Sequence, residues 1–379
     1  MSVLRHALSV QGRTGQGRAL DPRRVLVAIG PLAGKRGIEH RPFFMAERIL
    51  IVAPSWVGDA ILSEPLVAVL REPFEEPIVD VLAPPWCAPV YARMRGIGRV
   101  IESPFRHKEL GFARRRMLAR ELQSHGYTLA LVLPNSFKSA LIPWLARIPR
   151  RIGYVGEMRR ILLTDTLRLD RKALPRLVDR FVALAVARGR LIPTPPAPML
   201  VPNIANAGAA MRGLTLSTRR PIAILCPGAE YGPAKRWPTE HFIALARRML
   251  DAGYAVWLMG SPNDQPTAAP IAAAVAGVRD LTGRTDLGTA IDLLSLASVV
   301  VSNDSGLMHA AAAVGRPLIA LFGSSSPDYT PPLSPVAQVT RIDIECSPCF
   351  QRECPLGHFK CMRDLDPERV YQLALEAAA

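Results

Sequence analysis

The chain has 379 residues, of which 49% are hydrophobic and 21% are charged, and its formal net charge is +15. Because this length exceeds the roughly 250–300 residues at which a single core stops growing, we expect two domains. No apolar run approaches the roughly 18–20 residues that a membrane-spanning helix needs, which argues against an integral membrane protein.

The positive charge is concentrated in the first half of the chain. Residues 1–45 carry a net charge of +6, residues 46–205 carry 24 Lys/Arg against 14 Asp/Glu, and residues 206–379 carry 15 against 16. Such asymmetry predicts a polyanionic partner for the first half: nucleic acid, anionic lipid head groups or a phosphorylated glycan. Interleaved aromatic residues and helix-turn-helix or zinc-finger spacings are missing from the sequence, so we expect no nucleic acid partner.

Residues 1–45 are basic and glycine-rich, and they show little helical or strand periodicity. The composition changes sharply at Met45. We expect this extension to be either the product of a start codon assigned too far upstream or a disordered basic arm. Arginines interrupt any apolar core of a signal peptide here, and we therefore expect a cytoplasmic protein.

Short apolar runs alternate with helical stretches between residues 46 and 192. The expected strands are Ile49–Ala53, Ile78–Leu82, Arg99–Ile101, Leu129–Leu133 and Arg151–Tyr154, and the expected helices are Ala60–Leu70 (kinked or shifted by Pro65), Ala88–Met94, Phe112–Gln123, Phe137–Ala146 and Leu174–Arg188. This βα repetition, with a period near thirty residues, predicts an α/β domain with a mostly parallel, doubly wound sheet.

Asp59 follows the first expected strand and stands at the start of a helix. An aspartate in this place is most often a helix cap, and the alternative is a general base that faces a cleft. The positive end of a helix dipole would lower the pKa of Asp59 and keep it ionised at neutral pH. The loop has Gly58 as its only glycine and is therefore not a GxGxxG motif.

Two basic groups follow later strands of the same domain. Arg106 and Lys108, with Arg114–Arg116, flank the exit of the third expected strand, and Ser136 and Lys138 follow the fourth. Basic runs are usually solvated helix faces. Both groups fall at the sheet edge expected for Asp59. The alternative interpretation is therefore that their basic side chains recognise a phosphorylated partner.

Residues 193–204 are proline-rich and form the expected linker to a second domain, residues 205–379, in which the βα alternation restarts. Its expected strands are Pro221–Cys226, Tyr254–Met259, Val299–Val301 and Leu318–Phe322, and its expected helices run from Pro238 to about Asp251, from the turn at Asp264 to about Ala276, and over Leu287–Ala297 and Leu307–Val314. Lys235 closes the loop after the first of these strands, where a cation could neutralise a leaving phosphate.

Ser302-Asn303-Asp304-Ser305-Gly306 separates a buried strand from a helix of small residues. In a doubly wound sheet this turn places a helix N-terminus at the carboxyl edge, where its unpaired N–H groups suit a phosphate. Gly306 would allow close approach of the backbone, and His309 lies one turn into the helix. An ordinary capped βα unit is the alternative interpretation.

Four motifs together resemble the ADP-heptose–lipopolysaccharide heptosyltransferases of glycosyltransferase family nine. They are APSWVGD (53–59), PGAEYGPAKRWP (227–238), SNDSGLMHAAAAVGRP (302–317) and CPLGHFKCMRDLDPERV (354–370). The resemblance covers nearly everything from Ile49 onward. It implies a GT-B fold, with two Rossmann-like doubly wound domains that face each other across a cleft, and an inverting transfer of heptose. The second and fourth motifs are most similar to the members that add the second inner-core heptose.

The resemblance also implies roles for single residues. Asp59 matches the catalytic aspartate and Lys235 a lysine that contacts the donor phosphates, and both are assigned as catalytic. The implied donor-binding residues are Gly228, Asp264, Asp304, Ser305, Gly306 and His309. The implied partners are ADP-heptose, bound by the second domain, and heptosylated Kdo–lipid A at the inner-membrane surface, bound by the first. The candidate acceptor contacts are Arg106, Lys108, Arg114, Arg115, Arg116, Ser136 and Lys138.

Other functions remain open at this point. A heptosyltransferase for the first or a later core heptose shares the same motifs. A GT-B nucleotide-sugar epimerase would have a small acceptor side with no need for a basic face, which the charge of residues 46–205 disfavours. A non-catalytic binding module would leave Asp59 and Lys235 without a role.

A cysteine cluster near the end of the chain comprises Cys346, Cys349, Cys354 and Cys361. Four thiols are enough for a structural zinc ion, although only the first two have the spacing of a typical pair. In a reducing cytoplasm we favour plain thiols. We expect no cofactor and no catalytic metal.

Overall fold

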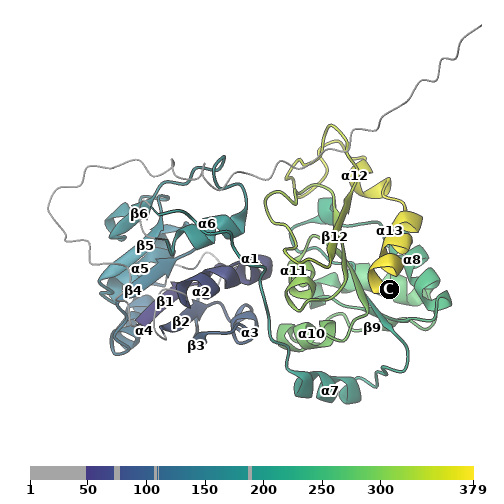
Figure 1. The fold of residues 1–379 in the computed structure, drawn as a ribbon, viewed down its shortest axis with the longest axis horizontal. Coiled ribbons are helices and arrows are strands. Elements are labelled where there is room, and N and C mark those ends of the chain that lie inside the picture. Colours follow the sequence, from purple (N-terminus) through teal and green to yellow (C-terminus); the bar gives the residue numbers. More distant parts are fainter. Residues whose placement is uncertain (1–47, 72–76, 106–108, 110, 187–189) are drawn as a thin grey trace, which may run out of the picture.

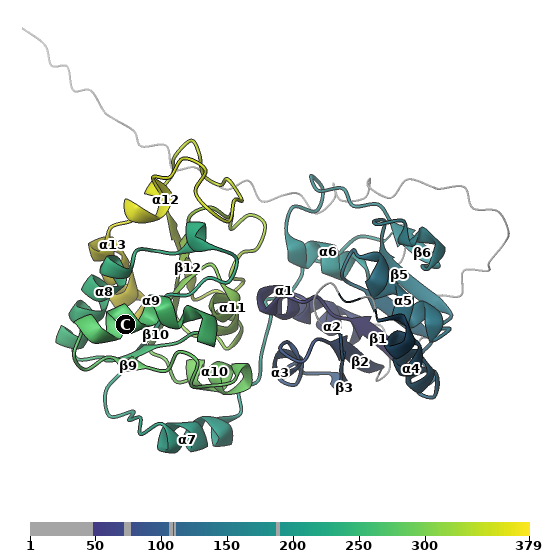
Figure 2. The same cartoon turned by 180° about the vertical axis from the view of Figure 1, so that it is seen from behind.

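The computed structural model describes residues 48–71, 77–105, 109, 111–186 and 190–379. The expected basic extension, residues 1–45, lies outside these residues, as do the candidate acceptor contacts Arg106 and Lys108. Two lobes lie side by side, and each is built on one sheet (Figures 1 and 2). Within the described residues, no helix combines the length and the apolar character required to cross a bilayer.

The first sheet has the strand order β3-β2-β1-β4-β5-β6. Its strands are β1 (Arg48–Val52), β2 (Ile78–Ala83), β3 (Ile97–Glu102), β4 (Leu129–Val132), β5 (Arg150–Tyr154) and β6 (Asp165–Leu167). The helices of this lobe are α1 (Val57–Leu62), α2 (Glu64–Arg71), α3 (Ala88–Tyr91), α4 (Phe112–Gln123), α5 (Phe137–Leu145) and α6 (Leu177–Ala183). Every strand pairing is parallel, as the βα repetition predicts.

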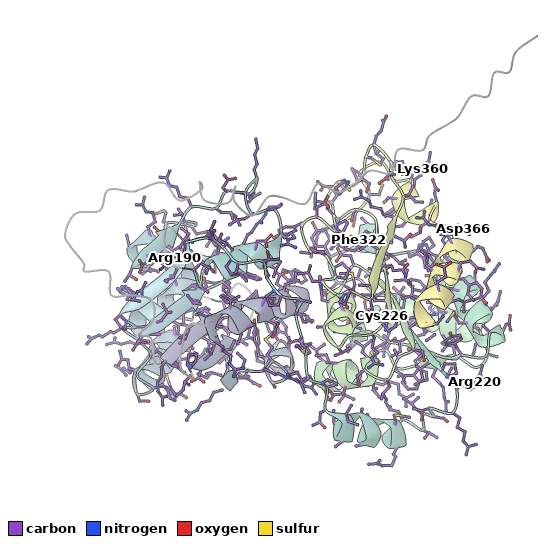
Figure 3. All side chains as sticks on the ribbon, in the orientation of Figure 1. Arg190, Arg220, Cys226, Phe322, Lys360 and Asp366 are labelled. Atoms are coloured by element: carbon purple, nitrogen blue, oxygen red, sulfur yellow. The ribbon has the colours of Figure 1, made fainter. Side chains whose placement is uncertain are left out.

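The second sheet repeats the same order when it is read from β9, namely β9-β8-β7-β10-β11-β12. Its strands are β7 (Ile222–Cys226), β8 (Ala255–Leu258), β9 (Arg279–Asp280), β10 (Val299–Asn303), β11 (Leu318–Phe322) and β12 (Ala337–Arg341). The helices are α7 (Ile204–Gly213), α8 (Thr239–Asp251), α9 (Gln265–Ala274), α10 (Leu287–Leu294), α11 (Gly306–Ala313), α12 (Lys360–Arg363) and α13 (Pro367–Ala378). Figure 3 shows Cys226 and Phe322 inside this lobe and Arg220 and Lys360 at its periphery.

Several helices differ from their sequence-based bounds. The single helix expected over Ala60–Leu70 is two helices, α1 and α2, which meet at Ser63 and place Pro65 in the first turn of α2. Proline is tolerated there because the first-turn N–H groups have no partner within the helix. The expected helices Leu174–Arg188 and Ala88–Met94 are shorter in the structure, as α6 and α3.

The two lobes share one buried apolar cluster, which runs from β1 and α1 through α10 and α11 to β7. Helix α1 lies against α11 at its centre. A side chain would not fit at Gly58, in the first turn of α1, or at Gly306, the first residue of α11. A Cβ atom at Gly58 would lie 2.7 Å from Cδ2 of His309, and one at Gly306 would lie 2.9 Å from Cβ of Val57. The two glycines therefore allow the N-terminal ends of α1 and α11 to approach closely.

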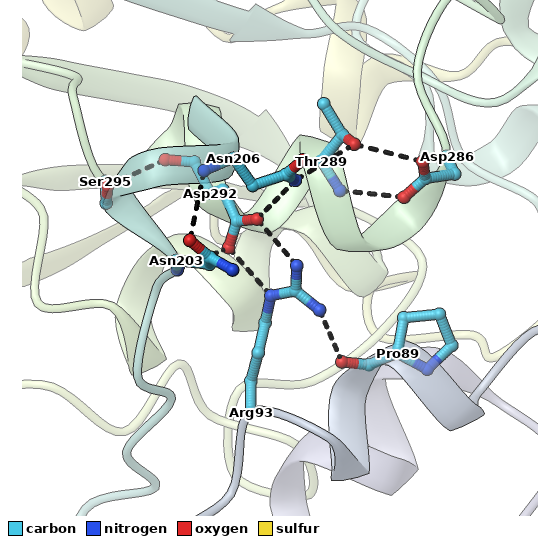
Figure 4. A network of polar contacts seen from close by, with 8 residues as sticks. All are labelled: Pro89, Arg93, Asn203, Asn206, Asp286, Thr289, Asp292 and Ser295. Atoms are coloured by element: carbon cyan, nitrogen blue, oxygen red, sulfur yellow. Dashed lines mark hydrogen bonds and ion pairs between the residues drawn. The ribbon is translucent and has the colours of Figure 1, made fainter. Parts of the chain in front are cut away.

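A polar network ties the lobes together at the linker (Figure 4). Arg93, which follows α3, binds the fully buried Asp292 of α10 through Nε (2.7 Å) and Nη2 (2.6 Å). The backbone N–H of Asn203 and the side-chain amide of Asn206 donate to the same carboxylate. Burial alone would raise the pKa of Asp292, but these hydrogen bonds lower it below its usual value. Removal of either partner would leave an uncompensated buried charge, so it should strongly destabilise the protein.

Candidate active site

Asp59 lies in the first turn of α1, at the carboxyl end of β1. The N-cap of this helix is Trp56, and its side chain makes no capping hydrogen bond. Asp59 is therefore not the helix cap, which was the alternative to a general base. Its side chain is partly exposed and faces the second lobe, where its charge interacts with those of Lys235 and Asp304.

The pKa of Asp59 is raised to about 6. Burial is the largest cause, the Lys235 ammonium lowers the pKa, and the Asp304 carboxylate raises it. The expectation of a lowered pKa was wrong, because loss of water around the carboxylate outweighs the helix dipole and the nearby cation. A pKa near 6 still leaves Asp59 mostly ionised at neutral pH, and it makes the carboxylate a better proton acceptor.

Lys235 is held by Asp304. It ends a short 3₁₀ turn after β7 (Pro233–Lys235), and its Nζ lies 2.5 Å from Oδ2 of Asp304. The Ser325 hydroxyl donates to the same oxygen over 2.5 Å. The two charged side chains are 15% and 5% exposed, so the pair is mostly buried and its geometry is fixed.

Helix α11 begins at the carboxyl edge of the second sheet, as its motif predicts. Ser305 is the N-cap, and its hydroxyl accepts from the backbone N–H of Met308 over 3.4 Å. His309 is 4% exposed and lies against Gly58 of the first lobe. Burial is the main reason why the pKa of His309 is lowered to about 4, so its imidazole is neutral at pH 7. Its assignment as a donor contact stays a prediction.

A cavity of about 1020 Å³ opens between the lobes beside α11. Its walls come from the loops after β1, β2, β7 and β8, from the start of α10 and from residues 305–307. Gly228, Asp264, Ser305 and Gly306 line it, so four of the six predicted donor-binding residues meet at one place. Asp304, His309 and Lys235 are not among the residues that line it.

Asp264 is buried under Gly228 at the wall of this cavity. A Cβ atom at Gly228 would lie 2.1 Å from Oδ1 of Asp264, so only glycine fits there. The other oxygen, Oδ2, accepts from both the backbone N–H and the hydroxyl of Ser261, each over 2.8 Å. Asp264 thus closes a capping box at its own turn. The assignment of Asp264 to donor binding remains a prediction.

A smaller cavity of about 100 Å³ lies at the corresponding edge of the first sheet. Ser136, Lys138 and Arg115 line it, and Ser136 is the N-cap of α5. Arg115 is 4% exposed, donates to the backbone oxygens of Lys138 (3.2 Å) and Glu109 (3.0 Å), and stacks on Phe105. Arg115 therefore holds the loops of this edge together.

The three consecutive arginines of α4 have different surroundings. Arg115 is buried, Arg114 forms an ion pair with Glu109, and Arg116 is exposed. Their common assignment to the acceptor rests on sequence alone and stays a prediction.

Comparison with known proteins decides the family. The profile described as "Glycosyltransferase family 9 (heptosyltransferase)" matches residues 115–360. Lipopolysaccharide heptosyltransferase 2 of Escherichia coli K12 is 42% identical over 86% of this chain and 97% of that protein. Lipooligosaccharide heptosyltransferase 2 of Haemophilus influenzae is 41% identical, over 87% and 99%. The solved structure of E. coli ADP-heptose LPS heptosyltransferase II superposes with a TM-score of 0.80 at 40% identity, and the match covers 87% of this chain and 98% of that one.

The chain belongs to glycosyltransferase family 9. The prediction of an enzyme is therefore confirmed. The predicted GT-B fold is confirmed too, because the two parallel six-stranded sheets match the heptosyltransferase II structure.

Two residues of the glycosyltransferase were missed by sequence reasoning. Arg159 is fully buried and donates to the backbone oxygen of Tyr154 and to the side chain of Asn135, so it pins the loops after β4 and β5. Nothing in the sequence distinguishes Arg159 from the other arginines nearby. Trp86 lines both cavities and donates from Nε1 to the backbone oxygen of Ser55 over 2.8 Å. Its position directly after the strand β2 was the available signal.

The four clustered cysteines carry free thiols. Burial is the first cause that raises the pKa of Cys361 to about 11, and the three neighbouring thiols raise it further. The Cys354 sulfur accepts from the backbone N–H of Phe359, and such hydrogen bonds lower the pKa of its thiol. Among the described residues, no three His, Cys, Asp or Glu side chains are arranged as a metal site. The expectation that the enzyme needs no cofactor stays a prediction.

Proposed function

We propose that this enzyme transfers L-glycero-D-manno-heptose from ADP-heptose to the first heptose of heptosyl-Kdo2-lipid A, in the lipopolysaccharide inner core. The observation that carries the proposal is the pairing of two loops across the cleft. The loop after β1 brings Asp59, and the corresponding loop after β7 brings Lys235 close enough to lower the pKa of Asp59. The names and the coverage of the relatives at 41–42% identity support heptose transfer to the core.

The proposed reaction is a single displacement with inversion. Asp59 accepts the proton of an acceptor hydroxyl while that oxygen forms a bond to the anomeric carbon of the heptose. The bond between this carbon and the diphosphate oxygen breaks, and ADP leaves with the electron pair. Lys235 and the N–H groups at the start of α11 stabilise the charge that develops on the diphosphate. We propose that these groups act without a catalytic metal.

The acceptor would lie against the first lobe, and the donor would lie in the large cavity. Ser136 and Lys138 line the smaller cavity at the edge where Asp59 stands. The net charge of +10 over residues 46–205 favours a phosphorylated acceptor.

We also propose peripheral association with the cytoplasmic face of the inner membrane. Met158 and Ile161 follow β5 and are 87% and 77% exposed, and the exposed Arg160 lies between them. The buried Arg159 fixes this turn beside the small cavity. Cosedimentation with phosphatidylglycerol vesicles tests the surface: a Met158→Ser/Ile161→Ser variant should bind less, whereas Leu356→Ser in the other lobe, also well exposed, should not. Equal binding of all three proteins would refute this surface.

The function itself is tested by ADP release from ADP-heptose with three acceptor conditions. We expect release with mono-heptosylated Kdo2-lipid A and little release with Kdo2-lipid A or without acceptor. Release with the non-heptosylated acceptor would indicate a first-heptose transferase. Consumption of ADP-heptose that is independent of acceptor would indicate a different reaction, such as epimerisation.

A further inference from the structure

The cysteine-rich segment between β12 and α12 is fixed against the loop that carries Lys235 (Figure 1). The Tyr231 hydroxyl donates to the backbone oxygen of Phe350 over 2.7 Å, and Nε of Arg352 donates to the backbone oxygen of Tyr231 over 2.8 Å. The backbone N–H of Ala234 donates to the backbone oxygen of Arg352 over 3.0 Å. A Cβ atom at Gly232 would lie 2.4 Å from that oxygen, so the two loops touch at backbone level.

This arrangement brings Arg352 to the wall of the large cavity. Among the described residues that line the cavity, Arg352 is the only lysine or arginine, while Glu230, Asp264 and Asp286 are acidic. A donor diphosphate carries about two negative charges. The cavity wall would repel it unless cations and N–H groups compensate for the carboxylates.

Lys235 alone does not supply this compensation. Its ammonium is paired with Asp304 at 2.5 Å, so the two charges together contribute no net positive charge. A second cation is therefore needed on the solvent side of the pair. The guanidinium of Arg352 uses Nε in its bond to Tyr231, and its two terminal nitrogens have the fork geometry that binds two phosphate oxygens.

We propose that Arg352 binds the diphosphate of the nucleotide-sugar donor, in the cavity that it lines together with the N-terminus of α11. This inference rests on the proposed function, since it takes ADP-heptose as the donor. It also assigns a role to the cysteine-rich segment, which is to hold Arg352 in position. Ser347 and Phe350 of this segment donate to the backbone oxygens of Gly323 (2.7 Å) and Ser324 (2.6 Å), at the end of β11.

Titration calorimetry with ADP and with adenosine tests the proposal. Arg352→Ala should weaken ADP binding about 10- to 100-fold, the range for loss of a charge-assisted hydrogen bond, and should leave adenosine binding within about twofold. Arg363→Ala removes another exposed arginine from the same region of the second lobe and should change neither affinity. Unchanged ADP affinity in Arg352→Ala would overturn the proposal. An equal loss for adenosine would overturn it too, because it would show a general distortion of the cavity.

A second comparison separates direct binding from positioning of Lys235. If Arg352 contacts the diphosphate itself, Arg352→Ala should still weaken ADP binding in a Lys235→Ala background. Disappearance of the effect in that background would show action through Lys235 only and would refute direct contact. Failure of the proposed function looks different, because the acceptor assays would then show another acceptor or epimerisation, whereas the effect of Arg352→Ala on ADP affinity is measured without any acceptor.

Discussion

The two halves of this enzyme share one strand order but present different chemistry at the same edge. In each half a charged residue of the candidate site follows the first strand: Asp59 lies in the first turn of α1, after β1, and Lys235 ends the 3₁₀ turn after β7. The cavity at the edge of the first sheet is about 100 Å³, and the cavity that opens between the lobes beside α11 is about 1020 Å³. The fold thus supplies two equivalent edges, and under the proposed function the loops make one of them a proton acceptor and the other a diphosphate site.

The charge distribution follows the same division. The first half is strongly basic, whereas residues 206–379 carry 15 Lys/Arg against 16 Asp/Glu. The second half therefore lacks a net positive charge, so the anionic donor of the proposed function has to bind through a few placed groups. We propose that these groups are the start of α11, Lys235 and Arg352.

Asp59→Asn should give the largest effect. The amide keeps the shape but cannot accept a proton, so kcat should fall by about 10²–10⁴, the range for loss of a general base. Because the proposed reaction gives Asp59 no contact with the diphosphate, the Kd for ADP should stay within about twofold. In the wild type, kcat/KM should rise with pH through about 6, since Asp59 must lose its proton to act. A variant with the turnover of the wild type would remove Asp59 from the mechanism.

Lys235→Ala should cost about 10²–10³ in kcat, as the loss of an electrostatic contact to developing charge does, and should also weaken ADP binding. It should have a second effect in the opposite half. Because the Lys235 ammonium lowers the pKa of Asp59, its removal should move the acidic limb of the pH profile to higher pH. A limb that stays in place, or a loss confined to acceptor affinity, would contradict the coupling across the cleft.

The sequence predicted the sheets because their central strands are continuous apolar runs. Strand β11 and helix α4 have the bounds expected from the sequence. Strand β11 was predictable because it is buried on both faces, and helix α4 was predictable because its ends are clear in the sequence. The edge strands β6 and β12 were not predicted. β6 has three residues, and β12 has a single buried residue, Thr340, so neither carries a hydrophobic pattern.

The predicted site residues lie near the cleft because each follows a strand, and parallel strands end at a common edge. Their electrostatic states could not be predicted in the same way. The pKa of Asp59 depends on burial by the other lobe and on the charges of Lys235 and Asp304, which are distant in sequence. Arg352 was overlooked for a similar reason, because it reaches the cavity through contacts with Tyr231 that leave no local sequence signal.

A smaller effect is expected on the acceptor side. Lys138→Ala should raise the KM for the acceptor about 2- to 10-fold, because an exposed ion pair contributes little individually. Arg116→Ala should have a smaller effect, since Arg116 does not line the small cavity. Acceptor affinity should fall as salt is raised, and donor affinity should change less. Arg212→Ala, an exposed change in the second half, is the control. Equal salt dependence of both substrates would count against an acceptor site in the basic half.

A different kind of effect, on stability and not on activity, is predicted at the junction between the halves. Glu64 begins α2, is 6% exposed, and accepts from the backbone N–H of Met199 in the linker over 3.2 Å. Burial raises its pKa from 4.5 to about 7, although the bond to Met199 opposes the rise. The folded protein therefore binds more protons than the unfolded chain between these two values, and the contribution of Glu64 to stability falls as pH rises through that window.

Glu64→Gln should remove this dependence. The amide oxygen can still accept from Met199 but carries no buried charge. At pH 8 the free energy of unfolding should rise by roughly 1–3 kcal/mol, and at pH 4 it should not change. Denaturant titrations at both values provide the measurement, and the exposed Glu121→Gln in the same half should show no difference between them. A loss of stability at pH 8 would mean that the ionised carboxylate, rather than the neutral acid, holds the linker against the first half.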